Sequence, residues 1–217
     1  MSLFESVTDY LDDFPEVKYS FQGDRSLEVF GNDRKVEISL DFTDLNVWKL
    51  DPEWLVSSPK IIASKVINEL GLSHRIYARK CAIERVSKPQ MEAFLKEHHL
   101  NGVAGAKHKI GLMYNNELVA IATFAAPRQI DGKRSAGLIR FCGKSFCSIS
   151  GGLNKLINHY IIHYPCDDIF TYVNVEYGDG KGFEKVGFQD EGIQDLKGKY
   201  FRKYRLIIDR SSFHQRT

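Results

Sequence analysis

Residues 137–188 read GLIRFCGKSFCSISGGLNKLINHYIIHYPCDDIFTYVNVEYGDGKGFEKVGF, and the rest of the chain is organised around them. A short apolar run at 138–142 is followed, after a loop, by apolar side chains at helical spacing over 153–164. Pro165 ends that helix, and a second apolar run follows at 169–175. A strand, a crossover helix and a second strand in this order predict a parallel pair of strands.

The loop before the helix ends in Ser150-Gly151-Gly152. Glycines let a backbone approach a ligand closely, and a helix N-terminus offers free N–H groups and a positive dipole end. The pattern therefore suits a phosphate or a diphosphate. The alternative is that the two glycines only form a tight turn between strand and helix.

The segment 182–188, GFEKVGF, completes a pattern that resembles the core of the GNAT N-acyltransferase superfamily. The resemblance spans roughly residues 78–208. It implies an α+β fold, with a GNAT-like mixed, mostly antiparallel sheet and flanking helices, beside a small N-terminal α/β region. In that superfamily the loop holds the pyrophosphate of coenzyme A, so the resemblance implies acetyl-CoA or another acyl-CoA as donor.

The resemblance places the coenzyme on the loop and its flanks. The residues concerned are Phe141, Cys142, Gly143, Ser148, Ser150, Gly151, Gly152 and Leu153. The family's loop usually begins with Arg or Gln and carries an earlier glycine, and residues 146–152 have neither. Phe183 stands where many relatives carry a tyrosine that acts as general acid.

A second resemblance is to the C-terminal half of phage and mobile-element proteins that carry a Vsr-like nuclease domain upstream. The phage DNA-modification protein Mom has a comparable arrangement. The segments that carry the likeness are Ile76-Tyr77-Ala78-Arg79-Lys80-Cys81, His99-Leu100-Asn101-Gly102, Leu138-Ile139-Arg140-Phe141-Cys142 and Gly151-Gly152-Leu153-Asn154-Lys155-Leu156. This likeness implies DNA or RNA as partner, rather than a small-molecule amine.

Two residues are candidates for the chemistry. His99 lies at the end of a helix expected to start at 87–89, and an imidazole near neutrality can act as general base. Its alternative role is to cap the helix end. Asn174 lies near the end of the second strand, where the family tends to have Asp, and it could orient a substrate. Glu176 and Asp179 are nearby carboxylates that could replace the missing base.

Four cations are candidate phosphate or substrate contacts. Arg128 and Arg140 could hold phosphates as bidentate forks, or form surface ion pairs. Arg202 and Lys203 belong to the tail 197–206, which interleaves cations with aromatic residues as nucleic-acid surfaces do. The same alternation also describes an edge strand protected by charges.

The charged residues are distributed unevenly along the chain. Residues 1–53 hold 5 Lys or Arg against 13 Asp or Glu, whereas residues 54–217 hold 25 against 15. We therefore predict an acidic N-terminal region, 1–75, beside a GNAT-like domain, 76–217; alternatively, the two surfaces attract each other. Glu28 and Glu37 lie on two hairpin strands and could together bind a hard cation. The likeness to mobile-element proteins would make this region a degenerate nuclease remnant. Alternatively, the two carboxylates are simply solvated.

Local patterns supply the remaining elements. We expect a helix at 2–14, strands at 17–21, 26–30, 35–40 and 78–86, a helix at 58–71, hairpin strands at 110–114 and 118–124, and a polar loop at 129–135. Asp51-Pro52 is expected to break the chain. The four cysteines have no Cys-x-x-Cys spacing, so we expect buried reduced thiols and no metal.

No apolar run is long enough to span a membrane, and the start MSLFESVTDYLDDF lacks a signal-peptide pattern. A cytoplasmic protein is expected. The leading hypothesis is a GNAT-like acyltransferase of phage or mobile-element type that acts on nucleic acid or a nucleic-acid-associated group. The alternatives are a non-catalytic nucleic-acid-binding module with a GNAT shape and a small-molecule N-acetyltransferase.

Overall fold

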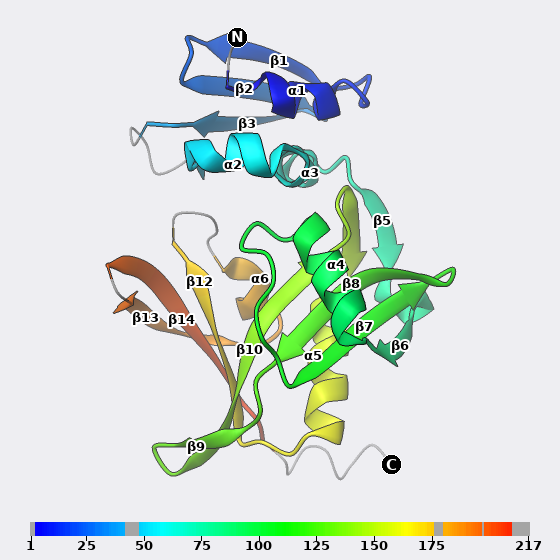
Figure 1. Ribbon diagram of the computed structural model, residues 1–217, viewed down its shortest axis with the longest axis vertical. Helices are drawn as coiled ribbons and strands as arrows, with labels where there is room; N and C mark the ends of the chain where they lie inside the picture. The colour runs from blue at the N-terminus through cyan, green and yellow to red at the C-terminus, as the bar shows by residue number, and fades with distance from the viewer. Residues whose placement is uncertain (1–2, 42–47, 176–179, 197, 210–217) are drawn as a thin grey trace. The chain divides into compact units, whose positions relative to one another are not determined.

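A computed structural model describes residues 3–41, 48–175, 180–196 and 198–209 (Figure 1). The chain forms two compact units. The N-terminal unit comprises Met1–Ile76, Glu92–Val103 and Gly143–Ser150, and the C-terminal unit comprises Tyr77–Met91, Ala104–Cys142 and Gly151–Thr217. The predicted division between residues 75 and 76 stays a prediction. Two later segments of the chain belong to the N-terminal unit.

The N-terminal unit is built on a four-stranded sheet with the order β1-β2-β3-β4. The strands are β1 (Lys18–Gln22), β2 (Ser26–Gly31), β3 (Arg34–Ser39) and β4 (Trp48–Lys49), and the helices are α1 (Glu5–Leu11), α2 (Pro52–Ser57) and α3 (Pro59–Glu69). Asn32 and Asp33 both have positive φ, at 51° and 55°, as a tight hairpin turn requires. The predicted hairpin is confirmed.

One face of this sheet supplies the core of the unit. Leu27, Val29 and Ile38 are fully buried, because alternation along a strand sends them to the same side. Helices α1, α2 and α3 contribute apolar residues to the same cluster. The break expected at Asp51-Pro52 is confirmed as the boundary between β4 and α2: Asp51 accepts a hydrogen bond from the backbone N–H of Glu53 and thereby caps α2.

The C-terminal unit holds the larger sheet, with the order β13-β14-β12-β10-β8-β7-β6 and β9 beside β10. Its elements are η1 (Ala78–Lys80), β6 (Ala82–Arg85), β7 (His108–Tyr114), β8 (Glu117–Phe124), β9 (Arg128–Ile130), β10 (Lys133–Gly143), α5 (Gly152–His163), β12 (Asp168–Asn174), α6 (Lys181–Glu184), β13 (Gln189–Leu196) and β14 (Lys199–Ile207). Strands β10 and β12 are parallel, and the other pairs with a known register are antiparallel. The predicted α+β class is confirmed.

Several elements cross or reach the boundary between the two units along the chain. Helix α4 (Lys88–His98) begins in the C-terminal unit and ends in the N-terminal unit. The short strands β5 (His74–Tyr77) and β11 (Cys147–Ser150) form a two-stranded sheet. Strand β11 falls in the stretch predicted to be only a loop.

Helix α5 lies against β7 and β8. The ring of Tyr160 stacks on that of Phe124 at 3.8 Å between centroids, and Leu156 and Ile157 are buried on the same helix. The apolar stripe predicted for residues 153–164 is therefore confirmed. Burial raises the pKa of the Tyr160 hydroxyl, as expected for a phenol held in an apolar layer.

Two local predictions for this unit are wrong, and the edge-strand alternative for the tail 197–206 is not met. Residues 78–86 form a 3₁₀ turn before β6, and 129–135 form a hairpin because Asp131 and Gly132 both adopt positive φ, at 49° and 77°. Strand β14 is not at the edge of the sheet, since β13 pairs with it on the outer side.

Candidate functional site

Strands β10 and β12 pair over a short length and then separate. Their register joins Ser135 to Asp168, Ala136 to Ile169 and Gly137 to Phe170, although both strands continue beyond these pairs. The two strands diverge above their common base in Figure 1. Their facing edges therefore offer backbone N–H and C=O groups to an extended ligand that contains amides.

A side chain marks the point of separation. The hydroxyl of Thr171 donates to the carbonyl oxygen of Leu138 at 3.0 Å, and this hydrogen bond is buried. The bond stands one residue past the last backbone pair, where a regular parallel ladder would continue. Thr171 was not among the sequence candidates, because a threonine within a strand carries no distinguishing signal.

The start of α5 is shaped for an anion. Gly151 has φ 76°, in the left-handed region, and no side chain caps the helix. The first helical bond runs from the Lys155 N–H to the Gly151 carbonyl at 3.0 Å, so the N–H groups of residues 152–154 have no partner within the helix. Only Ala78 lies within 4 Å of a Cβ built on Gly151, at 3.9 Å. Gly151 is exposed and therefore leaves the helix start open, whereas Gly152 is buried.

Lys155 ties this helix start to the turn η1. Its ammonium donates to the carbonyl oxygens of Ala78 at 3.0 Å and Cys81 at 2.6 Å. Arg79 and Lys80 lie on that turn and are exposed. The sequence candidates omitted these two cations, although the segment 76–81 had been singled out.

The coenzyme residues predicted from the sequence fall in both units. Phe141, Cys142, Gly151, Gly152 and Leu153 belong to the C-terminal unit, whereas Gly143, Ser148 and Ser150 belong to the N-terminal unit. The thiol of Cys142 is buried, and this burial raises its pKa to about 12. Cys142 is therefore a protonated packing residue rather than a nucleophile.

The segment after β10 is held in a strained conformation. Phe146 has φ 60°, which a non-glycine residue adopts at a cost of about 1–3 kcal/mol. Its N–H donates to the hydroxyl of Ser64 at 2.7 Å, and its carbonyl accepts from the N–H of His74 at 2.9 Å. Its ring lies 5.4 Å from that of Phe14. All four residues belong to the N-terminal unit.

The two histidines at the end of α4 differ in their contacts. Nδ1 of His98 lies 3.0 Å from the hydroxyl of Ser145 and accepts from its N–H at 3.3 Å. Nδ1 of His99 accepts from the N–H of Asn101 at 3.1 Å, as in the capping alternative. The role of His99 as a base stays a prediction. His98 was not among the sequence candidates, and its bond to Ser145 was missed.

Strand β12 carries Phe170, Tyr172 and Asn174 at alternate positions, as predicted, so the three side chains share one face. Phe170, Tyr172 and Asn174 lie opposite Arg205, Lys203 and Phe201 of β14 in the register. Asn174 is half-buried, so it is available for a substrate only in part. Glu176 and Asp179, the candidate replacement carboxylates, lie outside the described residues.

The candidate cations of β14 have partners on β13. Arg202 pairs with Asp190, and Lys203 with Glu191 at 2.7 Å. Arg205 pairs with Glu191 and also with the fully buried Asp168, at 2.9 Å. Any phosphate that bound Arg202 or Lys203 would have to displace a carboxylate.

The other two candidate arginines lie on β9 and β10. Arg128 is exposed, whereas Arg140 is half-buried and burial lowers the pKa of its guanidinium. Arg140 donates to the carbonyl of Ile139 at 3.0 Å. These positions leave Arg128 the more accessible of the two.

Phe183 has an apolar role. Its ring stacks with that of Tyr204 at 5.9 Å and meets the edge of Phe188 at 5.4 Å. Tyr204 is fully buried. The side chain at this position therefore supports α6 and cannot donate a proton.

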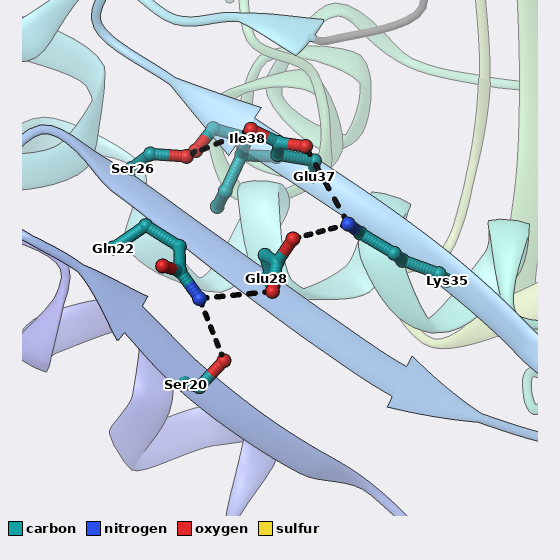
Figure 2. A network of polar contacts seen from close by, with 7 residues as sticks. All are labelled: Ser20, Gln22, Ser26, Glu28, Lys35, Glu37 and Ile38. Carbon is teal, nitrogen blue, oxygen red and sulfur yellow. Dashed lines mark hydrogen bonds and ion pairs between the residues drawn. The ribbon is translucent and has the colours of Figure 1, made fainter.

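The two hairpin carboxylates of the N-terminal unit share a lysine (Figure 2). The ammonium of Lys35 pairs with Glu28 and lies 3.8 Å from Glu37. Gln22 donates to Glu28 at 2.9 Å, and Ser26 donates to Glu37 at 3.2 Å. The hydrogen bond from Lys35 lowers the pKa of Glu28. Lys35 thus supplies the positive charge that a bound cation would otherwise bring.

Among the described residues, no group of three or more His, Cys, Asp or Glu side chains could hold a metal ion. Within the same residues, no helix has the length and apolar character needed to cross a membrane.

Comparison with known proteins yields structural likeness only. No family model and no curated protein matches the chain. A GNAT-family acetyltransferase from Bacillus cereus is 14% identical, with 60% of this chain and 99% of that chain covered and a TM-score of 0.43. The ribosomal-protein-S18-alanine N-acetyltransferase from Escherichia coli is 13% identical, with 59% and 94% covered and a TM-score of 0.47.

Naa50 from Arabidopsis thaliana, solved with a CoA-containing bisubstrate analogue, is 11% identical, with 59% and 99% covered and a TM-score of 0.45. At such identities the likeness concerns the fold alone, and no residue role is transferred from it. The comparisons give no support to the predicted likeness to proteins with a Vsr-like nuclease domain or to Mom.

Proposed function

We propose that the chain is a GNAT-like N-acyltransferase that uses an acyl-CoA donor. One observation carries the proposal: the parallel strands β10 and β12 separate at the Thr171–Leu138 hydrogen bond. An extended molecule with amide groups can pair with strand edges that no longer pair with each other. The pantetheine arm of coenzyme A has this chemistry.

The start of α5 fits the diphosphate of the same coenzyme. The N–H groups of Gly152, Leu153 and Asn154 point out of the helix end without a side-chain cap. Arg79 and Lys80 would add two charges from the turn that Lys155 holds. When bound, the coenzyme would supply an activated acyl thioester.

The chain's own contribution to the reaction would be positioning. An amine nitrogen of the acceptor would form a bond to the acyl carbon and lose its proton to a base. The C–S bond of the thioester would break, and the released thiolate of coenzyme A would take up a proton from solvent. His99 is the candidate base from the sequence, and Phe183 provides no acid. Backbone donors beside the diverging strands would orient the thioester and stabilise charge on its oxygen.

Thermal denaturation with acetyl-CoA tests this proposal. We expect the coenzyme to raise the melting temperature, because it binds only the folded chain. Gly151→Asp should abolish the rise by placing a carboxylate against phosphate. Gly151→Ala, which adds backbone strain at φ 76° without charge, should keep most of it. No rise for the wild type at millimolar coenzyme would remove the donor assignment.

For the acceptor, we propose a nucleic acid or a group bound to one. The exposed cations Arg79, Lys80, Arg128, Lys133 and Arg134, all in the C-terminal unit, support this.

The ion pairs of Arg202 and Lys203 favour a small-molecule amine instead. A third possibility is a non-catalytic nucleic-acid-binding module. The apolar packing of Phe183 favours it, because this residue cannot act as a general acid. Such a module would bind DNA or RNA with no effect of acetyl-CoA. A small-molecule enzyme would bind coenzyme and show no salt-sensitive binding of nucleic acid.

A further inference from the structure

Two histidines lie one turn apart on helix α5, within the C-terminal unit. His159 and His163 stand at positions i and i+4, so their side chains share a face of the helix. Their rings are stacked, with 4.0 Å between centroids and 29° between planes. His163 is exposed and His159 is half-buried, beside the buried stripe that contains Tyr160. Both residues are therefore accessible from solvent, at least in part.

A hydrogen bond to the backbone fixes the tautomer of one ring. Nδ1 of His163 lies 2.8 Å from the carbonyl oxygen of His159. A carbonyl oxygen can only accept, so Nδ1 carries a proton, and the neutral ring keeps its lone pair on Nε2. Histidines that bind metals usually make such an orienting bond through the ring nitrogen that is not the ligand. The bond thus prepares Nε2 of His163 as a metal ligand.

The spacing of the two histidines is that of a chelating pair. Histidines at i and i+4 on one helix face can bind a single metal ion, as they do in helices with two zinc ligands. Neutral imidazole is a ligand that zinc, nickel and copper ions accept well. The pair supplies only two ligands, so the remaining coordination positions would hold water. Lys155 lies one turn before His159, but its ammonium is bonded to the carbonyl oxygens of Ala78 and Cys81.

We propose that His159 and His163 form a binding site for a divalent transition-metal ion such as Zn²⁺, Ni²⁺ or Cu²⁺. The stacked rings would turn so that Nε2 of His163 and one ring nitrogen of His159 face the ion. The site is separate from the proposed diphosphate position, because His159 lies about 12 Å beyond Gly151 along the helix axis. An ion held by both side chains requires a formed helix, so it stabilises the folded chain.

The test uses the full, untagged chain in a non-thiol reductant, with Ni²⁺ as the probe. Titration calorimetry measures affinity and stoichiometry, and broadening of amide NMR signals by the paramagnetic ion locates it. The single variants are His159→Gln and His163→Gln. A double variant, His159→Gln with Asn158→His, keeps the number of histidines but changes their spacing. The control is His74→Gln, at an exposed histidine of the N-terminal unit.

We expect the wild type to bind one Ni²⁺ at this site, with the strongest broadening in the last two turns of α5. Each single variant should bind about tenfold more weakly or worse, since loss of a ligand costs at least as much as loss of the group that orients it. The double variant should bind no better than His159→Gln alone. The control His74→Gln should bind as the wild type does.

Four outcomes would overturn the site. They are a wild type that does not bind Ni²⁺, broadening centred outside α5, single variants that bind like the wild type, and a double variant that does so. The last of these would show that two histidines suffice without the i, i+4 spacing. Because the broadening is measured on the wild type, it tests the position of the ion whether or not a substitution disturbs the helix.

Discussion

Thr171 and Leu138 hold together the two strands that then separate. The threonine hydroxyl donates to the leucine carbonyl at 3.0 Å in a buried setting, one residue beyond the last backbone pair of β10 and β12. A side chain thus satisfies a backbone oxygen where the ladder ends. The proposed donor site begins at this bond, so its loss has consequences for both stability and binding.

Replacing Thr171 by Val keeps the shape of the side chain and removes the hydroxyl. We expect Thr171→Val to lower the free energy of unfolding by about 1–3 kcal/mol, because the Leu138 carbonyl is left buried without its partner. Thr171→Ser, which keeps the donor, should cost less. Urea denaturation measures both, and equal stability of the two variants would contradict the importance of this bond.

Gly180 faces the buried ring of Tyr204. A Cβ on Gly180 would lie 2.3 Å from Tyr204 Cε2, and the backbone has φ 70°. Gly180→Ala should therefore destabilise the protein by about 3 kcal/mol, from overpacking and left-handed strain together. Gly182→Ala is the matched control, since a Cβ there meets nothing within 4 Å. A melting temperature that is the same for both variants would show that α6 can move away.

Phe146 allows a test of the backbone strain by itself. Phe146→Ala and Phe146→Gly both remove the ring, but only glycine adopts φ 60° without a steric cost. We expect the glycine variant to be more stable than the alanine variant by about 1 kcal/mol, although glycine normally weakens a folded chain. The opposite order in chemical denaturation would mean that the residue is not left-handed in solution.

The sequence predicts the elements whose signals are local. Asn32-Asp33 and Asn115-Asn116 each formed the expected hairpin, and the stripe that contains Tyr160 formed the expected helix. Failures occurred where a turn lay inside a polar run. Asp131-Gly132 is a tight turn with positive φ at both residues, yet the polar composition of 129–135 led to the prediction of a loop.

The candidate site was predicted less well, because its contacts are long-range. Gly151 could be recognised from the loop and helix alone. The bonds from Ser64 and His98 to residues 145–146 join positions that are 82 and 47 residues apart, and no spacing reveals them. Likewise, the pairing of Arg202 with Asp190 depends on β13 lying outside β14.

The ion pairs between β13 and β14 predict a dependence of stability on pH. Hydrogen bonding from Arg205 lowers the pKa of Glu191, so its carboxylate stabilises the fold above its usual pKa. That contribution is lost as the pH falls through the lowered value. Glu191→Gln should cost about 1 kcal/mol at pH 7, since the side chain is 33% exposed, and almost nothing near pH 3.

Urea denaturation at pH 7, 5 and 3 measures this difference. Glu84→Gln is the control, because Glu84 is exposed on β6 and forms no ion pair within the described residues. A destabilisation by Glu191→Gln that stayed constant down to pH 3 would show that shape, rather than charge, accounts for the effect.

The hairpin of β9 and β10 offers exposed cations to the proposed nucleic-acid partner. Arg128, Lys133 and Arg134 are exposed there, whereas Arg202 and Lys203 are paired with carboxylates. If phosphates contact the hairpin, Arg128→Glu with Lys133→Glu should weaken binding at least tenfold. The slope of log affinity against log salt should shrink by about two, the number of lost phosphate contacts.

Fluorescence anisotropy measures the affinity and its salt dependence, with labelled single- and double-stranded DNA and RNA at about 50 to 200 mM salt. The protein concentrations should cover the expected range of non-specific dissociation constants. Arg202→Glu with Lys203→Glu is the comparison. Its main effect should be lower stability, because Asp190 and Glu191 would then face two further carboxylates. A larger loss of affinity in this variant than in the hairpin variant would place the contact on β14. If the wild type binds neither DNA nor RNA at low salt, the nucleic-acid proposal is wrong, and the small-molecule amine is the candidate acceptor that takes its place.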